Sequence, residues 1–153
     1  MALITTRSKY ALGTLRMPEP QGPELVCVRM THDLIAAPGL NDTLWLGDLP
    51  ARCVPVDCIY DSDDIDSNGA PAVTVSVGFL NAAKTDLAST AWIVSSTVGQ
   101  AAGMASPTTN TLVKSAVSND AQPVGLKFTA APATFAAGTV GLTLFYRAVH
   151  GTQ

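Results

Sequence analysis

The residues of this chain whose types and spacing best suit chemistry are the carboxylates of one short segment, Asp61-Ser62-Asp63-Asp64-Ile65-Asp66-Ser67-Asn68-Gly69. With Asp57, this segment holds five of the twelve acidic residues of the chain. An EF-hand calcium loop needs oxygen ligands at positions one, three and five and a glutamate at position twelve. Counted from Asp61, position five is Ile65 and position twelve is Ala72, so the pattern fails. A looser calcium site between strands stays open, beside the simpler interpretation of a solvated hairpin turn in which Asn68-Gly69 supplies positive-φ residues.

Nucleophilic chemistry finds little support. His32-Asp33 is the only histidine that stands beside a carboxylate, and the second histidine is His150. A Ser-His-Asp hydrolase needs a placed nucleophile, yet no G-x-S-x-G motif occurs and Ser95-Ser96 lies in an ordinary run. Nothing marks Cys27 as activated by a neighbouring charge. We therefore predict that the chain is not an enzyme.

Metal and cofactor sites are equally poorly supported. The three cysteines, Cys27, Cys53 and Cys58, form no C-x-x-C pair, whereas structural zinc needs four ligands. Cys27 and Cys58 stand in apolar runs, where a free thiol behaves as a small hydrophobic group. The segment 99–103 resembles a phosphate loop, but no G-K-[ST] follows it. We interpret it as a tight turn where two backbones approach, and predict no metal and no cofactor.

The two tryptophans leave two interpretations open. Trp45 and Trp92 could form a sugar-binding platform on a β-sandwich. In a chain with so few aromatic residues, tryptophan is more often part of the core.

The composition favours a weakly charged surface. Charged residues make up 14% of the chain, against about 25% in typical domains. The net charge is −3 and the nine basic residues are scattered, which argues against nucleic-acid binding. A small basic cluster, Arg7, Lys9 and Arg16, precedes the first acidic residue, Glu19. Weakly charged surfaces suit association with further copies of the chain or with other chains. A compact domain with a neutral surface is the simpler alternative.

The chain is expected to be neither secreted nor membrane-bound. Its apolar stretches are far shorter than the roughly 20 residues that a spanning helix needs. The N-terminus lacks the apolar region of a signal peptide. We therefore expect folding in the cytoplasm in which the chain is made.

Two segments show the period-two alternation of half-buried β-strands, residues 73–79 and 139–147. Further strands are expected at 25–30, 44–46, 53–60, 90–95, 112–117 and 124–129, and one or two helical turns at 97–104. Within 53–60, Val54, Val56, Cys58 and Tyr60 are expected on one face, and Pro55 near a sheet edge or at a bulge. The alternation predicts the following core residues: Val73, Val75, Val77, Phe79, Leu126, Phe128, Val140, Leu142 and Leu144.

About eight short strands separated by turn residues favour a β-sandwich, a jelly roll or a small barrel. No long amphipathic helix occurs, which disfavours a βαβ fold. Before the first confident strand, residues 1–17 are expected to be extended, and three prolines between Pro18 and Pro23 predict a stiff spacer. We therefore divide the chain into an N-terminal arm with its proline-rich spacer, residues 1–24, and one β-domain, residues 25–153.

Several segments, taken together, resemble a known family. They are Leu49-Pro50-Ala51, Val56-Asp57, Asp61 with Asp63-Asp64, Val75 to Gly78, Thr97 to Gly103 and Val140 to Arg147. Over roughly residues 44 to 147, the chain resembles small structural proteins of tailed-bacteriophage virions, and among these most closely the capsid decoration, or cement, proteins.

This resemblance implies a single-domain, all-β sandwich of jelly-roll type, here with an extended N-terminal arm, and no catalytic residues. It implies a location on the capsid surface of the virion, the major capsid protein as partner, and a bridge between neighbouring capsid subunits. It also implies a homo-oligomer, with a trimer favoured over a dimer. Arg7, Lys9 and Arg16 are then the candidates for capsid contact. Another virion component, such as a head–tail or tail protein, and a carbohydrate-binding module are the alternatives.

Overall fold

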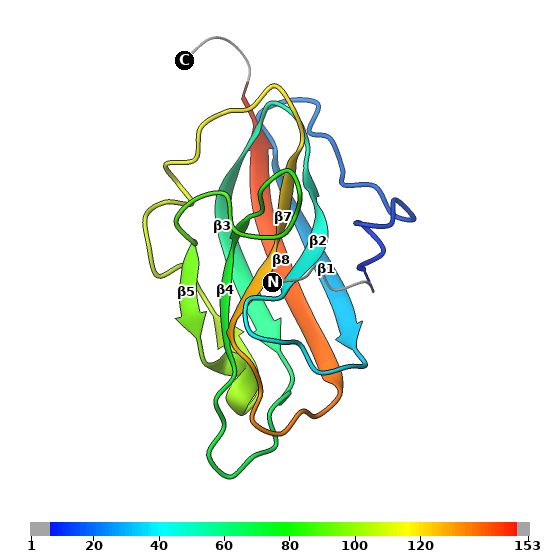
Figure 1. The fold of residues 1–153 in the computed structure, drawn as a ribbon. Helices are drawn as coiled ribbons and strands as arrows, with labels where there is room; N and C mark the ends of the chain where they lie inside the picture. The colour runs from blue at the N-terminus through cyan, green and yellow to red at the C-terminus, as the bar shows by residue number, and fades with distance from the viewer. Residues whose placement is uncertain (1–6, 150–153) are drawn as a thin grey trace.

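Two four-stranded antiparallel β-sheets stack face to face in the computed structural model, which describes residues 7–149 (Figure 1). The first six residues of the expected arm, and the segment 150–153 with His150, lie outside the described residues. The first sheet contains, in order, β1 (Leu25–Leu34), β8 (Gly138–Ala148), β3 (Cys53–Ser62) and β6 (Gly103–Ala105). The second contains β2 (Thr43–Leu49), β7 (Gln122–Ala130), β4 (Thr74–Phe79) and β5 (Ile93–Ser96).

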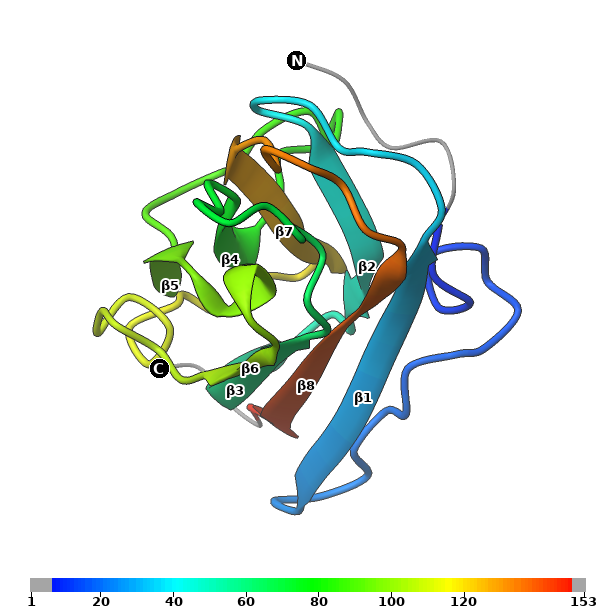
Figure 2. The same cartoon turned by 90° about the horizontal axis from the view of Figure 1, so that it is seen from below.

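The all-β class and the sandwich are thereby confirmed. The chain changes sheet at every connection except the one from β4 to β5, and the first and last strands are neighbours. Figure 2 shows the two layers from below, with β1 and β2 at the same side of the sandwich. Eight strands wound in two Greek keys make a jelly roll. We interpret the observed strand order as that type.

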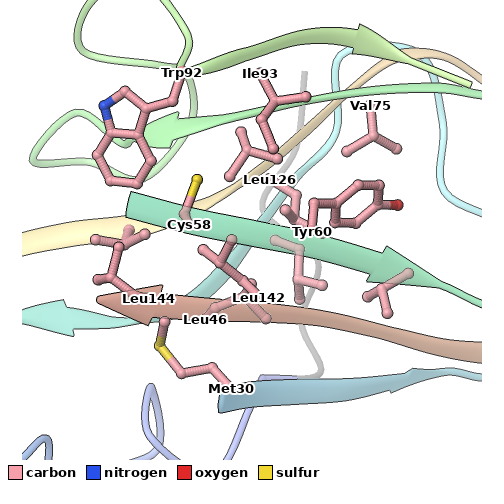
Figure 3. Packing of buried hydrophobic residues seen from close by; sticks show 14 of the residues in the cluster. Met30, Leu46, Cys58, Tyr60, Val75, Trp92, Ile93, Leu126, Leu142 and Leu144 are labelled. Atoms are coloured by element: carbon pink, nitrogen blue, oxygen red, sulfur yellow. The ribbon is translucent and has the colours of Figure 1, made fainter. Parts of the chain in front are cut away.

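The core lies between the sheets and contains all nine residues that the alternation predicts. Each of them is at most 7% exposed. Figure 3 shows side chains from both sheets meeting there, including Val75 and Leu126 from the second sheet and Leu142 and Leu144 from the first. Trp92 is also buried, and its ring stands edge-on to Phe79 with 4.8 Å between the centroids.

Two expected elements differ from the observed ones. The segment 97–104 forms a single 3-10 helix, η1 (Val98–Gln100), and then β6. The expected strand at 112–117 is wrong, because residues 111–114 form a turn, in which Leu112 is buried and Val113 is exposed, and residues 115–117 have no regular structure. β6 has only three residues and pairs with β3 as an edge strand, so its own sequence carries almost no period-two signal.

Pro55 lies at a β-bulge, one of the two positions expected for it. The register of β3 against β8 shifts between Pro55 and Asp57. A bulge inserts one residue and so reverses which side chains face the core. For this reason Val56 is 37% exposed while Cys58 and Tyr60 are fully buried. The expectation that Val54 and Val56 lie on the same face of the strand as Cys58 and Tyr60 was wrong.

The described part of the expected arm folds against the sandwich. Residues 8–15 form hydrogen-bonded turns, such as Leu12 N–H to the carbonyl of Ser8 at 3.0 Å, instead of an extended segment. The buried Ser8 hydroxyl donates to the Leu46 carbonyl of β2. Further along, the Tyr146 hydroxyl donates to the Pro18 carbonyl at 2.6 Å. This segment lies at the side of the sandwich where β1 and β2 form the sheet edges (Figures 1 and 2).

Candidate functional site

A groove of about 460 Å³ lies between this N-terminal segment and the second half of β1. One wall consists of Arg7–Tyr10 and Leu15, and the other of Arg29 and Thr31–Asp33. The first wall is fixed to the sandwich, since Ser8 bonds to β2 and Tyr10 packs against the core. The groove therefore belongs to the fold and does not require a rearrangement to form.

Three basic side chains line the groove. The Arg29 guanidinium binds both carboxylate oxygens of Asp61, at 2.5 and 3.2 Å, and this bond raises the pKa of Arg29. Arg7 lies over the ring of Trp45, 5.4 Å from its centroid, at cation–π distance. Within residues 7–149, neither Arg7 nor Lys9 forms an ion pair. The groove can thus still attract carboxylates.

The Arg29–Asp61 pair crosses the outer face of the first sheet. Arg29 is on β1 and Asp61 on β3, and Gly141 of β8 lies between them. A Cβ atom at Gly141 would be 2.7 Å from the Asp61 carboxylate and 3.0 Å from the Arg29 guanidinium. A larger residue at this position would displace the two side chains from the ion-pair geometry seen here.

The candidate nucleophilic residues are not arranged for catalysis. His32 and Asp33 are successive strand residues, so they point to opposite faces. Burial lowers the pKa of His32, and Asp33 accepts a hydrogen bond from the Thr139 hydroxyl at 2.7 Å. Burial raises the pKa of the Cys58 thiol to about 12, so it is protonated at neutral pH. Of the two cysteines in apolar runs, Cys58 is buried, whereas Cys27 is exposed on β1.

The acidic segment serves the fold. Asp63 accepts the Thr139 N–H at 2.8 Å, and Asp64 accepts the Asp66 N–H at 3.1 Å. The hairpin interpretation was wrong, because the segment connects β3 of one sheet to β4 of the other, and neither Asn68 nor Gly69 has a positive φ. Across residues 7–149, no group of three or more His, Cys, Asp or Glu side chains could hold a metal ion.

Asp66 is the anchor of this connection. It is 1% exposed and accepts four backbone N–H groups at 2.7 to 3.1 Å, those of Ala72, Val73, Ala133 and Thr134. Burial alone would raise the pKa of this carboxyl, but the four donors outweigh it and lower the pKa far below its ordinary value. One carboxylate therefore joins the β3–β4 and β7–β8 connections at the same end of the sandwich (Figure 1).

The two tryptophans do not form a shared platform. Trp92 is buried, and Trp45 is half-buried with the Lys84 ammonium 4.3 Å from its ring centroid. A second groove, of about 500 Å³, lies at the other end of the sandwich between the segments 79–90 and 111–123. Its lining is mostly apolar or small, with Lys114 as its one charged residue.

The predicted capsid-contact residues are only partly brought together. Arg7 and Lys9 line the first groove, whereas Arg16 is exposed and is not among its lining residues. Sequence reasoning missed Arg29. The alternation of residues 25–34 could have indicated its place on the outer face, but not its partner on β3.

No helix of residues 7–149 has the length and apolar character to cross a membrane. Comparison with protein-family models found no match, and comparison with curated proteins also found none.

Two solved structures share the fold. A chain of the capsid of Ralstonia phage GP4 is 36% identical, covers 97% of this chain and 99% of its own, and superposes with a TM-score of 0.86. A chain of the cyanophage Pam1 capsid asymmetric unit is 23% identical, covers 90% of this chain and 96% of its own, and gives a TM-score of 0.69. The second likeness shows the fold alone. The identity and coverage of the first show that this chain belongs to a family of bacteriophage capsid structural proteins.

Proposed function

We propose that the protein decorates the outer surface of a phage capsid and stabilises it by bridging neighbouring major capsid subunits. The observation that carries this proposal is the 36% identity with a capsid chain over nearly the full length of both chains. The described side chains support a role through surface contact, because the candidate nucleophiles are buried, unactivated or engaged in the fold. A bridge binds only the assembled shell, so it stabilises that state by mass action.

Charge supports the choice of surface. Arg7 and Lys9 face an accessible groove and have no carboxylate partner within residues 7–149. Carboxylates of the shell would pair with them, with Arg16 as a further exposed cation. Exposed ion pairs contribute about 0–1 kcal/mol each and weaken as salt screens them.

We also propose that the protein forms a homo-oligomer, a trimer in preference to a dimer. The outer face of the first sheet exposes apolar side chains from three strands, with Leu25 58%, Val56 37% and Met104 73% exposed. These side chains are spread over the face, because Leu25 pairs with Arg147 at one end of β8 and Met104 pairs with Asp61, which is opposite Gly141 nearer the other end. The proposal of an oligomer therefore rests on the weakly charged composition, which makes surfaces easy to desolvate, and on the resemblance to cement proteins. The preference for a trimer rests on the resemblance to cement proteins. Light scattering of the purified protein measures the state, and a monomer at every concentration would count against the proposal.

The capsid role is tested by adding the protein to undecorated particles and heating them. We expect wild-type protein to bind and to raise the temperature at which the particles rupture. The variant Lys9→Glu should bind a few-fold more weakly, and the loss should shrink at high salt. The matched control Lys114→Glu reverses an exposed charge beside the other groove and should bind as wild type. If wild-type protein does not bind undecorated particles at all, decoration is excluded and a head–tail or tail role gains support.

A further inference from the structure

β1 is an edge strand whose free side borders the groove. It pairs with β8 along ten residues and is the outermost strand of its sheet (Figure 2). For Arg29, Met30 and Thr31, the described residues provide no backbone hydrogen bond other than those with β8. The outward N–H and C=O groups of an edge strand are a template for one more strand. Proteins usually protect such edges by covering or shortening them.

The opposite wall makes this edge a defined site. Arg7–Tyr10 and Leu15 stand across the groove from Arg29 and Thr31. This wall is held by the Ser8 bond to β2 and by turn hydrogen bonds such as Leu15 N–H to the Lys9 carbonyl at 3.1 Å. A chain entering the groove would therefore meet a preformed space beside β1.

The charges that line the groove determine which kind of peptide segment binds there most favourably. Arg7 and Lys9 contribute two positive charges that no carboxylate of residues 7–149 neutralises, while Arg29 is balanced by Asp61. Asp33 adds a negative charge in the wall, already bonded to Thr139. An acidic segment is favoured, with its carboxylates placed toward Arg7 and Lys9.

We propose that the groove binds an extended, carboxylate-bearing segment of the capsid partner, which adds to the first sheet as a strand beside β1. Backbone hydrogen bonds to the β1 edge would supply affinity, and Arg7 and Lys9 would supply the preference for acidic residues. This inference rests on the proposed function, since the segment belongs to the shell.

Hydrogen–deuterium exchange with mass spectrometry tests the inference, using the full chain free in solution and bound to undecorated phage particles. Amides in peptides covering residues 29–33 should exchange at least tenfold more slowly when bound. Peptides covering 111–117 provide the internal control and should be unchanged. The double variant Arg7→Glu/Lys9→Glu should bind at least tenfold more weakly than the single control Lys114→Glu.

Three outcomes would overturn the inference. If the protein binds the particles and exchange at 29–33 is unchanged, strand addition is wrong while decoration stands. If nothing binds, the proposed function fails and the inference fails with it. If 29–33 is already protected in free protein at high concentration and not in dilute protein, a second copy of the chain occupies the edge instead.

Discussion

Replacing Leu142 by alanine is expected to lower the free energy of unfolding by about 2–5 kcal/mol. Leu142 is fully buried, and its strand β8 lies between β1 and β3, where its register partners are Met30 and Tyr60. Strands on both sides hinder collapse of the cavity that the truncation leaves. We therefore expect a loss in the upper half of this range, measured as a shift of the urea unfolding midpoint.

The matched control is Leu40→Ala, which removes the same atoms from a side chain that is 59% exposed. Surface substitutions of this kind usually change stability by less than about 0.5 kcal/mol. Equal losses at the two positions would contradict the arrangement of the core between the two sheets.

Replacing Asp66 by asparagine is expected to destabilise the protein strongly at neutral pH. The four backbone N–H groups that meet this carboxylate come from two connections, and an amide offers them one oxygen in place of two. The NH₂ group of the asparagine side chain is itself a donor, and it would face backbone N–H groups that also donate. Asp120→Asn is the matched control, because it neutralises an exposed aspartate.

The loss should depend on pH with a definite sign. The pKa of Asp66 is lower in the folded than in the unfolded state, so its stabilising effect is complete above the ordinary aspartate pKa of about 4 and declines as the pH falls below it. The stability difference between wild type and Asp66→Asn should therefore be smaller at about pH 3 than at pH 7. Urea unfolding at both values measures it. Two results would refute this role of Asp66: a stability difference that is the same at pH 3 and pH 7, or a destabilisation by Asp66→Asn no larger than that by Asp120→Asn.

The sequence could predict the core because the period-two pattern determines which face is buried. Val73, Val75, Val77 and Phe79 alternate with small or polar residues, and all four are buried as expected. The same pattern failed in β3, where the bulge after Pro55 adds a residue and changes the phase. Proline indicated a bulge or an edge, but the pattern could not tell which.

Features that depend on distant contacts could not be predicted. Gly125 shows this: a Cβ atom there would be 2.2 Å from the Leu44 carbonyl oxygen and 2.8 Å from the Leu80 side chain. β2 and the segment after β4 approach the backbone at Gly125 so closely that glycine is required there. The residues around Gly125 in the sequence give no sign of this approach. β6 likewise forms only because β3 offers it an edge.

The candidate site was predictable only in part. Arg7 and Lys9 can be recognised in the sequence as cations that precede the first acidic residue, Glu19. The structure places both in one groove. Arg29, which belongs to the opposite wall of the groove, lies about twenty residues after Lys9 in the sequence. The turns that bring the two walls together have no simple sequence signature. Asp66 belonged to a segment singled out for calcium, but its donors Ala133 and Thr134 follow 67 and 68 residues later.

The resemblance to virion proteins came from scattered segments, and the capsid family is confirmed by the comparison with the Ralstonia phage GP4 capsid chain. Decoration, bridging and the trimer remain proposals, because they concern contacts with other chains.

The central claim is tested most directly by electron cryomicroscopy of undecorated particles incubated with the purified protein. The account predicts density for this fold on the outer face of the shell, at junctions between neighbouring major capsid subunits and in groups of three, with the groove beside β1 turned toward the shell. Density confined to the portal or tail of the complete virion, with none on the shell, would contradict it.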